Sequence, residues 1–257
     1  MRYSARPMPS PWLAVTAAEY EEHMGPGGTD QLAPLSAIFQ QIYARARPRR
    51  LLVPGCGTGA FLEHVDPEVT ERTVGIDLNI QYVTVARQRY RRMGASVELY
   101  CADALHAQLQ PAADFDLVHL SLILEHVDAE ALLRAVGEWI APGGTCAVVL
   151  QRPGAAAPGE GAAHESLRRV VREMRLVEPG RVADLLAREG LGRAGSWELP
   201  LKEGARFHVA LFRAPLARAG AAEKAVRAAA EAARAADPAS AAGAPAGGDR
   251  DPGDAAA

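Results

Sequence analysis

The stretch LLVPGCGTGAFL, at residues 51–62, decides the fold. Its first residues are apolar, as in a buried strand, and they run into three glycines at alternate positions and then into a predicted helix. Glycines at 55, 57 and 59 let the backbone turn tightly and approach a ligand with no Cβ in the way. An ordinary strand-to-helix loop would look similar, so the turn needs support from the rest of the chain.

Two acidic residues downstream give that support. Asp77 ends the apolar run Val74-Gly75-Ile76-Asp77, where a carboxylate can accept hydrogen bonds from both hydroxyls of a ribose. Asp103 follows the next run, where a carboxylate can accept from an adenine amino group. Each acid alone could instead cap a helix. In this order behind the glycine turn, the two acids favour a nucleoside ligand.

From residue 51 onward, short apolar runs alternate with helix-like stretches, which is typical of βαβ units in a parallel, doubly wound sheet. The last two runs are joined only by Lys202 to Arg206. So short a link suits an antiparallel hairpin and not a helical crossover. The predicted strands are 51–54, 73–77, 96–100, 115–122, 145–151, 195–201 and 207–212.

Apolar residues at helical spacing predict helices between and before these strands. The first two precede the first strand, and we expect them to cover an edge or the mouth of the sheet. Pro179 and Gly180 are expected to separate the last two. The predicted helices are 13–24, 30–46, 79–93, 128–140 and two within 165–189.

The predicted elements and the composition of the tail divide the chain into three parts. Residues 1–47 are predicted to be an N-terminal helical cap segment, and residues 48–214 the α/β domain. Residues 215–257 are rich in alanine and almost lack large apolar groups, so this tail cannot build a core and is expected to be largely disordered. Residues 221–236 within it could form a marginal helix.

The motifs VPGCGTG, GID, CADA, FDLV and APGGT, spread over residues 53–145, resemble those of the class I S-adenosylmethionine-dependent methyltransferase family. The resemblance covers roughly residues 50–213. It implies a Rossmann-like, doubly wound sheet of seven mostly parallel strands with the last one antiparallel, and S-adenosylmethionine across the carboxyl ends of the first strands. The cofactor-binding residues it implies are Gly55, Cys56, Gly57, Gly59, Asp77, Leu78, Asp103, Ala104 and Leu120.

One position departs from the family pattern. Many members carry an acid two residues before the first glycine, where it helps to organise the amino group of the cofactor, but this chain has Val53. Backbone carbonyls near Gly55 or Leu120 are the alternatives for that amino group.

By the same resemblance, the segment from Asp116 to Val127 lines the reactive end of the cofactor. A sulfonium is already an activated methyl donor, so proximity and orientation supply much of the rate, and a base is needed only when the acceptor must lose a proton. Glu125 and His126 are the candidate bases, with a loop-capping or solvent-facing pair as the alternative. His119 lies inside a strand and is predicted to be a core histidine with its hydrogen bonds satisfied, and not a ligand.

Two segments are candidate lids. Tyr20, His23, Met24 and Gln31 could fold over the cofactor or form a partly exposed helix end. Residues 151–164, rich in Gly, Ala and Pro, could contact the acceptor, with Gln151 facing it, or could form a mobile loop.

Charge and composition limit the classes of binding partner that the sequence predicts. A net charge of -3 gives no pull toward nucleic acid, and no apolar run is long enough for a membrane span. Three scattered cysteines predict reduced, buried thiols, scattered histidines predict no metal site, and the absence of a secretory signal favours the cytoplasm. Oligomeric state cannot be derived from these patterns.

The leading hypothesis is methyl transfer from S-adenosylmethionine to a small organic acceptor, with S-adenosylhomocysteine as product. A catalytically inactive, S-adenosylmethionine-binding accessory or regulatory protein is the alternative, and Val53 is the residue that favours it. An NAD-dependent dehydrogenase is disfavoured by the glycine spacing and by Asp103.

Overall fold

A computed structural model describes residues 10–111, 114–154 and 164–216. All of them belong to one compact unit, residues 1–217. The predicted tail lies outside the described residues from 217 onward, and so does its predicted helix at 221–236.

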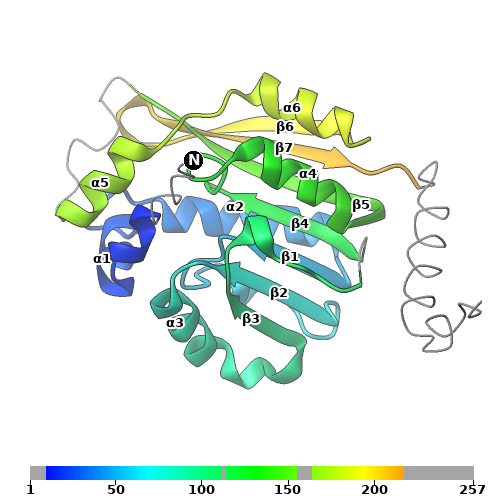
Figure 1. Cartoon of the computed structure of the whole chain (residues 1–257), viewed down its shortest axis with the longest axis horizontal. Helices are drawn as coiled ribbons and strands as arrows, with labels where there is room; N and C mark the ends of the chain where they lie inside the picture. The colour runs from blue at the N-terminus through cyan, green and yellow to red at the C-terminus, as the bar shows by residue number, and fades with distance from the viewer. Residues whose placement is uncertain (1–9, 112–113, 155–163, 217–257) are drawn as a thin grey trace, which may run out of the picture. The chain divides into compact units, whose positions relative to one another are not determined.

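Seven strands form one sheet in the order β3-β2-β1-β4-β5-β7-β6 (Figure 1). Strands β1 to β5 pair in parallel, whereas β7 runs antiparallel to both β5 and β6. The predicted fold class is confirmed, and all seven predicted strands are present. Their bounds are β1 Arg50–Pro54, β2 Arg72–Asp77, β3 Val97–Cys101, β4 Phe115–Ser121, β5 Ile140–Arg152, β6 Gly192–Pro200 and β7 Arg206–Arg213.

The reversed strand follows from the short link that the sequence contains. Only a single 3-10 turn, η5 at Lys202–Gly204, separates β6 from β7, and a link of this length joins antiparallel neighbours. β7 therefore folds back between β6 and β5. The carboxyl ends of β1 to β5 all remain at one edge of the sheet.

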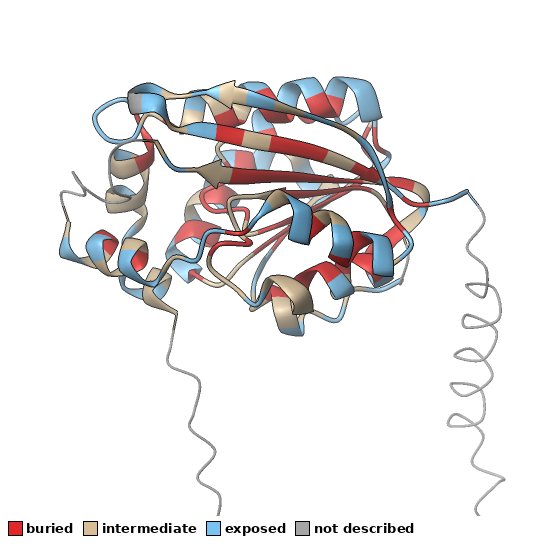
Figure 2. Cartoon of the chain, turned by 90° about the horizontal axis from the view of Figure 1, so that it is seen from above, coloured by how far each residue is buried: buried red, intermediate tan, exposed pale blue. Residues whose placement is uncertain are grey.

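Helices cover both faces of the sheet. In Figure 2 the strands are mostly buried, and the helices on either side of them are partly exposed. Leu51 and Val53 pack into the core beneath α2 and α3, whereas Leu52, on the opposite side of the same strand, packs beneath α4 and α6. Because both faces are covered, β1 reads as a continuous apolar run. The helices are α2 Leu32–Ala46, α3 Ile80–Tyr90, α4 Ala129–Trp139 and α6 Pro179–Arg188.

Three local predictions need correction. The predicted helix at 13–24 is two elements, η1 at Pro11–Ala14 and α1 at Ala17–Met24, because Thr16 starts α1 with a capping box to Glu19. The glycine turn leads into a single 3-10 turn, η2 at Leu62–His64, and not into a full helix.

The third correction concerns Pro179 and Gly180, which do not separate the last two helices. α5 at Glu165–Glu173 ends before residues 174–178, and Pro179 then opens α6. A proline suits the first helical position because its missing N–H would have no partner there.

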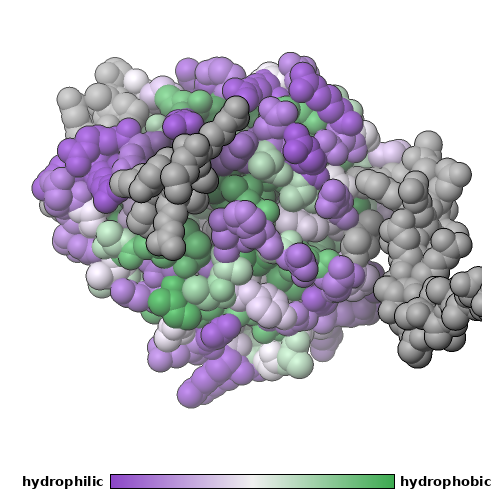
Figure 3. Space-filling model, viewed as in Figure 1, coloured by the Kyte–Doolittle hydropathy of each residue, from purple (hydrophilic) through white to green (hydrophobic). Residues whose placement is uncertain are grey.

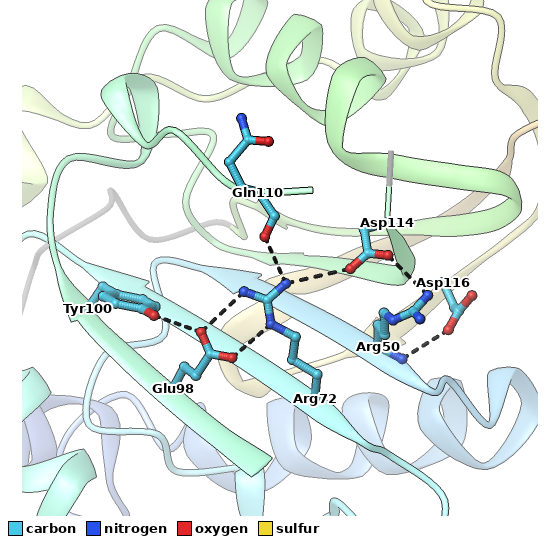
Figure 4. A network of polar contacts seen from close by, with 7 residues as sticks. All are labelled: Arg50, Arg72, Glu98, Tyr100, Gln110, Asp114 and Asp116. Atoms are coloured by element: carbon cyan, nitrogen blue, oxygen red, sulfur yellow. Dashed lines mark hydrogen bonds and ion pairs between the residues drawn. The ribbon is translucent and has the colours of Figure 1, made fainter. Parts of the chain in front are cut away.

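An ionic network ties the amino ends of the central strands together (Figure 4). The Arg72 guanidinium donates to both carboxylate oxygens of Glu98, at 2.8 and 3.2 Å, and lies 3.5 Å from Asp114. Asp114 also pairs with Arg50 at 3.0 Å, and the Arg50 N–H donates to Asp116 at 2.9 Å. These contacts join β1 to β4 at the edge opposite to the carboxyl ends.

The visible face of the molecule has hydrophobic residues in separate patches and a mostly hydrophilic outline (Figure 3). The large apolar side chains that are exposed lie on different elements, among them Ile80 on α3 and Tyr100 on β3. Scattered apolar residues of this kind are normal on a protein surface.

His119 lies in the core, as predicted, but the prediction that its hydrogen bonds are satisfied is wrong. It is fully buried on β4 between Phe39 and Phe61, with ring centroids 5.1 and 5.5 Å away. Both ring nitrogens are buried without a hydrogen-bond partner in the described part of the chain. Burial lowers the pKa of His119 from 6.5 to about 4, so the ring stays neutral in the folded protein.

We predict that His119→Leu stabilises the protein more at pH 5 than at pH 8. Between pH 6.5 and 4 the unfolded chain binds a proton that the folded imidazole does not, so His119 costs stability as the pH falls through this window. The free energy of unfolding of the variant, minus that of the native protein, should grow by about 2 kcal/mol from pH 8 to pH 5. Urea unfolding at both pH values measures it, and an equal difference at both would contradict the assignment.

Candidate active site

A cavity of about 530 Å³ lies at the carboxyl ends of the parallel strands. Ligands of open α/β sheets bind at this edge, outside the strand ends. The residues after β1, β2, β3 and β4 and the end of β5 line it, with a further wall from η1, α1 and α5. α1 and α5 lie at this end of the sheet in Figure 1.

The glycine turn forms the floor of the cavity. Gly55, Gly57 and Gly59 all have positive φ, at 69°, 54° and 75°, a conformation that L side chains rarely adopt. A Cβ on Gly57 would lie 2.9 Å from the Tyr20 hydroxyl oxygen. Gly55, Cys56 and Gly57 line the cavity, but Gly59 does not. Its carbonyl accepts a hydrogen bond from the Tyr90 hydroxyl at 2.6 Å, so Gly59 packs the turn against α3.

Asp77 joins the glycine turn to the end of β2. The N–H of Gly57 donates to Oδ2 at 2.8 Å, and the N–H of Asn79 donates to Oδ1 at 2.9 Å. Burial raises the pKa of the Asp77 carboxyl, and these backbone donors act against that rise. Each oxygen keeps lone pairs for a further donor, so a ribose hydroxyl can bind beside the backbone contacts.

Two tyrosines flank Asp77. Tyr20 and Tyr82 both line the cavity, with ring centroids 4.9 Å apart. The Tyr82 hydroxyl is buried and has no partner among the described residues. Sequence reasoning missed Tyr82, because its place in the first turn of α3 looks like ordinary helix packing. Its proximity to the acid at the end of β2 was the available signal.

Asp103 lines the cavity and also caps a turn. Its Oδ1 accepts from the N–H of Leu105 at 2.9 Å, and its Oδ2 lies 3.0 Å from Nδ1 of His106. Asp103 therefore does cap a turn, as the alternative predicted. Its carboxylate nevertheless lies in the cavity wall. Leu78 and Ala104 line the cavity beside the two acids.

Val53 and Leu120 lie outside the cavity lining. Both are fully buried, on opposite faces of the sheet. The end of β4 contributes Ser121, Leu122 and Ile123 in place of Leu120.

Leu122 has a φ of 52°, the left-handed conformation that costs a non-glycine residue about 1 to 3 kcal/mol. Its N–H donates to the Val149 carbonyl at 3.1 Å, which holds the chain in this turn at the cavity wall. Strain of this kind is often found at functional sites.

Glu125 is a buried carboxyl in the cavity wall, 2% exposed. Its Oε1 accepts from the N–H of Gln151 at 2.8 Å, whereas its Oε2 is buried without a hydrogen-bond partner in the described ranges. Burial raises the pKa of Glu125 from 4.5 to about 7. The side chain is thus neither solvent-facing nor a fully satisfied loop cap.

His126 also lines the cavity, with its ring edge-on to Trp12 at a centroid distance of 5.1 Å. Burial lowers the pKa of His126 to about 4. The imidazole is therefore neutral near pH 7, able to accept a hydrogen bond but a weak base.

The N-terminal segment forms a roof over the cavity. Val15 packs against Leu167 and Val170 of α5, and the Asn79 amide donates to the carbonyls of Trp12 and Val15, at 2.9 and 2.8 Å. Of the predicted lid residues, the structure brings Tyr20, His23, Met24, Gln31 and Gln151 to the cavity wall, while residues 155–163 of the second lid candidate lie outside the described residues.

Three further observations bear on the sequence predictions. Cys56 and Cys146 are buried and Cys101 is exposed, which corrects the prediction that all three thiols are buried; all three are free. Within the described ranges, no three His, Cys, Asp or Glu side chains gather closely enough to hold a metal ion. In the same ranges, every helix is too short or too polar to cross a membrane.

Residues 52–144 match a family model described as a methyltransferase domain. The chain is 34% identical over 115 residues to ubiquinone biosynthesis O-methyltransferase of Aromatoleum aromaticum. The aligned region covers 44% of this chain and 49% of that protein. It is 30% identical over 97 residues to phosphoethanolamine N-methyltransferase 1 of Arabidopsis thaliana, 37% of this chain and 20% of that protein. The chain thus spans half or less of these curated relatives.

Among solved structures, the chain is similar to the N-methyltransferase NodS from Bradyrhizobium japonicum in complex with S-adenosylhomocysteine, with a TM-score of 0.57 and 18% identity over 78% of this chain and 99% of that one. An O-methyltransferase family protein from Burkholderia thailandensis gives a TM-score of 0.59 and 16% identity, covering 79% and 60%. These structures share the fold. The family match identifies residues 52–144 as a methyltransferase domain, in agreement with the class I S-adenosylmethionine-dependent motifs of the sequence.

We predict that Gly57→Ala impairs binding of S-adenosylhomocysteine, whereas Gly94→Ala does not. Both glycines have positive φ, so alanine strains the backbone at both positions, and at Gly94, where ψ is −141°, by at least as much as the roughly 1 to 2 kcal/mol of the left-handed helical region. Only at position 57 does the added Cβ meet a neighbour, the Tyr20 hydroxyl at 2.9 Å; nothing lies within 4 Å at position 94. Calorimetry should show a loss of roughly tenfold or more for Gly57→Ala alone. Equal affinities for both variants would contradict this role of the turn.

Proposed function

We propose that this protein transfers a methyl group from S-adenosylmethionine to a small organic acceptor, mainly by holding donor and acceptor in line. The observation that carries the proposal is the cavity at the strand ends, which the glycine turn, Asp77, Asp103, Glu125 and His126 all line. The O- and N-methyltransferase relatives support the reaction class.

The residues present fit the cofactor. The glycine turn offers backbone without side chains in the way, Asp77 has lone pairs for ribose hydroxyls, and Asp103 has them for an adenine amino group. The unpartnered Tyr82 hydroxyl is a further contact for the nucleoside. Leu78 and Ala104 would border the adenine. When bound, the cofactor supplies an electrophilic methyl group on a sulfonium.

The chain contributes to the reaction by positioning donor and acceptor and by excluding water from the cavity. Trp12, Leu167 and Val170 exclude water from the roof side, which strengthens polar contacts inside. Where the acceptor must lose a proton, Glu125 is the better base, because its pKa lies near 7 while that of His126 lies near 4. His126 accepts a hydrogen bond and orients the acceptor.

The size of the cavity supports a small acceptor. Its volume of about 530 Å³ must hold both cofactor and acceptor, within the usual size of small-molecule sites. The net charge of -3 argues against a nucleic-acid substrate. Three free cysteines are compatible with the cytoplasm, which we retain as the proposed compartment.

Val53 supports one alternative, an accessory or regulatory protein that binds S-adenosylmethionine without turnover. A buried valine stands where many methyltransferases carry an acid. This alternative shares the cofactor site and differs only in lacking product formation, so turnover assays with acceptor mixtures separate the two.

We expect Asp77→Ala to weaken binding of S-adenosylmethionine and S-adenosylhomocysteine by about 1 to 3 kcal/mol, because one or two hydrogen bonds to ribose are lost. Asp184→Ala, on the exposed side of α6, is the matched control and should bind normally. Isothermal titration calorimetry measures both. Absence of binding to the native protein would overturn the proposed function.

A further inference from the structure

The carboxyl of Glu125 has one oxygen for which the described residues supply no partner. Oε1 is held by the Gln151 N–H, at the end of β5, and the Glu125 carbonyl accepts from the Arg175 N–H at 2.8 Å. The residue is thus fixed on both sides, while Oε2 stays buried and unpaired. Leaving a buried acceptor unpaired costs about 1 to 3 kcal/mol, and more when it is charged. A donor on a ligand in the cavity would remove that cost.

The charges around the cavity favour a cationic donor. The described lining has three carboxyls, Asp77, Asp103 and Glu125, and Lys202 is the only lysine or arginine in it. Lys202 is itself paired with Asp30 at 2.9 Å. With Asp77 and Asp103 at the nucleoside end, Glu125 is the acid left for the acceptor. The same lining offers no arginine for a phosphate group.

The remaining surroundings of Glu125 are apolar and aromatic. His126 follows Glu125 in sequence, and its neutral ring stands edge-on to Trp12 in the wall of the same cavity. α5 and the residue after it contribute Leu167, Val170, Val171 and Met174. An aromatic face next to a carboxylate stabilises an ammonium group, and the aliphatic wall accommodates a hydrocarbon body.

We propose that Glu125 binds the amino group of the methyl acceptor, and that the acceptor is an apolar amine that bears no phosphate. This inference rests on the proposed function and adds the substrate class. Glu125 is in this account a catalytic residue, because it contacts the reacting nitrogen.

The step balances with the groups named. The acceptor enters as an ammonium ion beside the Glu125 carboxylate, an N–H bond breaks, and the proton passes to Oε2. The freed nitrogen lone pair forms the bond to the methyl carbon while the carbon–sulfur bond breaks, and that electron pair stays on sulfur. The methylated amine and S-adenosylhomocysteine leave, and Glu125 returns its proton to water.

Matched probes test the proposal. Calorimetry on the protein saturated with S-adenosylhomocysteine compares 2-phenylethylamine with 2-phenylethanol, and hexylamine with 1-hexanol. We expect at least one amine to bind tenfold or more tightly than its alcohol. Glu125→Gln, which keeps an oxygen for the Gln151 N–H, should abolish the preference. Glu178→Gln, an exposed glutamate paired with Arg152, should retain it.

Binding of S-adenosylhomocysteine to each variant shows that it is folded and separates the two proposals. If the native protein fails to bind the nucleoside, the proposed function itself is wrong. If the nucleoside binds normally but no amine is preferred, or the preference survives Glu125→Gln, only the amine acceptor is overturned. If Glu125→Gln weakens S-adenosylhomocysteine and leaves 5′-methylthioadenosine unaffected, the carboxylate serves the amino group of the cofactor, which also overturns the proposal.

Discussion

The hydrogen bond from the Gly57 N–H to the Asp77 carboxylate holds the candidate site together. It spans 2.8 Å and joins the turn after β1 to the end of β2. The turn can present that N–H only because three glycines adopt positive φ, and Asp77 is fixed from its other oxygen by Asn79. Asn79 in turn holds the carbonyls of Trp12 and Val15. One short chain of polar contacts therefore runs from the cavity floor to its roof.

The two edges of the sheet differ in their charged groups, although the buried Thr73 hydroxyl near the amino edge also has no partner among the described residues. At the amino edge, Arg72 pairs with both Glu98 and Asp114, so the strand ends are well fixed. At the carboxyl edge, Leu122 is strained, the Tyr82 hydroxyl is unpaired, and Glu125 has an unpaired oxygen. Backbone strain and unpaired buried polar atoms reduce stability, and they are tolerated where a bound ligand compensates for them. This contrast supports the proposed binding site at the carboxyl edge.

The sequence predicted those features that depend on local pattern. Strand periodicity located all seven strands, and the five-residue link predicted the reversed hairpin. The resemblance to class I methyltransferases, together with the rule that parallel strands end at a common edge, predicted that Asp77, Asp103, Glu125 and His126 lie near one another, and all four line the cavity. The environment of each residue could not be predicted in this way. The buried, unpaired oxygen of Glu125 and the Trp12–His126 contact depend on segments far apart in sequence, and Tyr82 looked like helix core.

A crystal structure of the protein with S-adenosylhomocysteine tests the central claim most directly. The account predicts both ribose hydroxyls within hydrogen-bond distance of the Asp77 carboxylate while the Gly57 N–H contact persists, and the sulfur directed toward the side of the cavity that holds Glu125 and His126. A nucleoside bound elsewhere, or bound in the cavity with Asp77 turned away from the ribose, would contradict it.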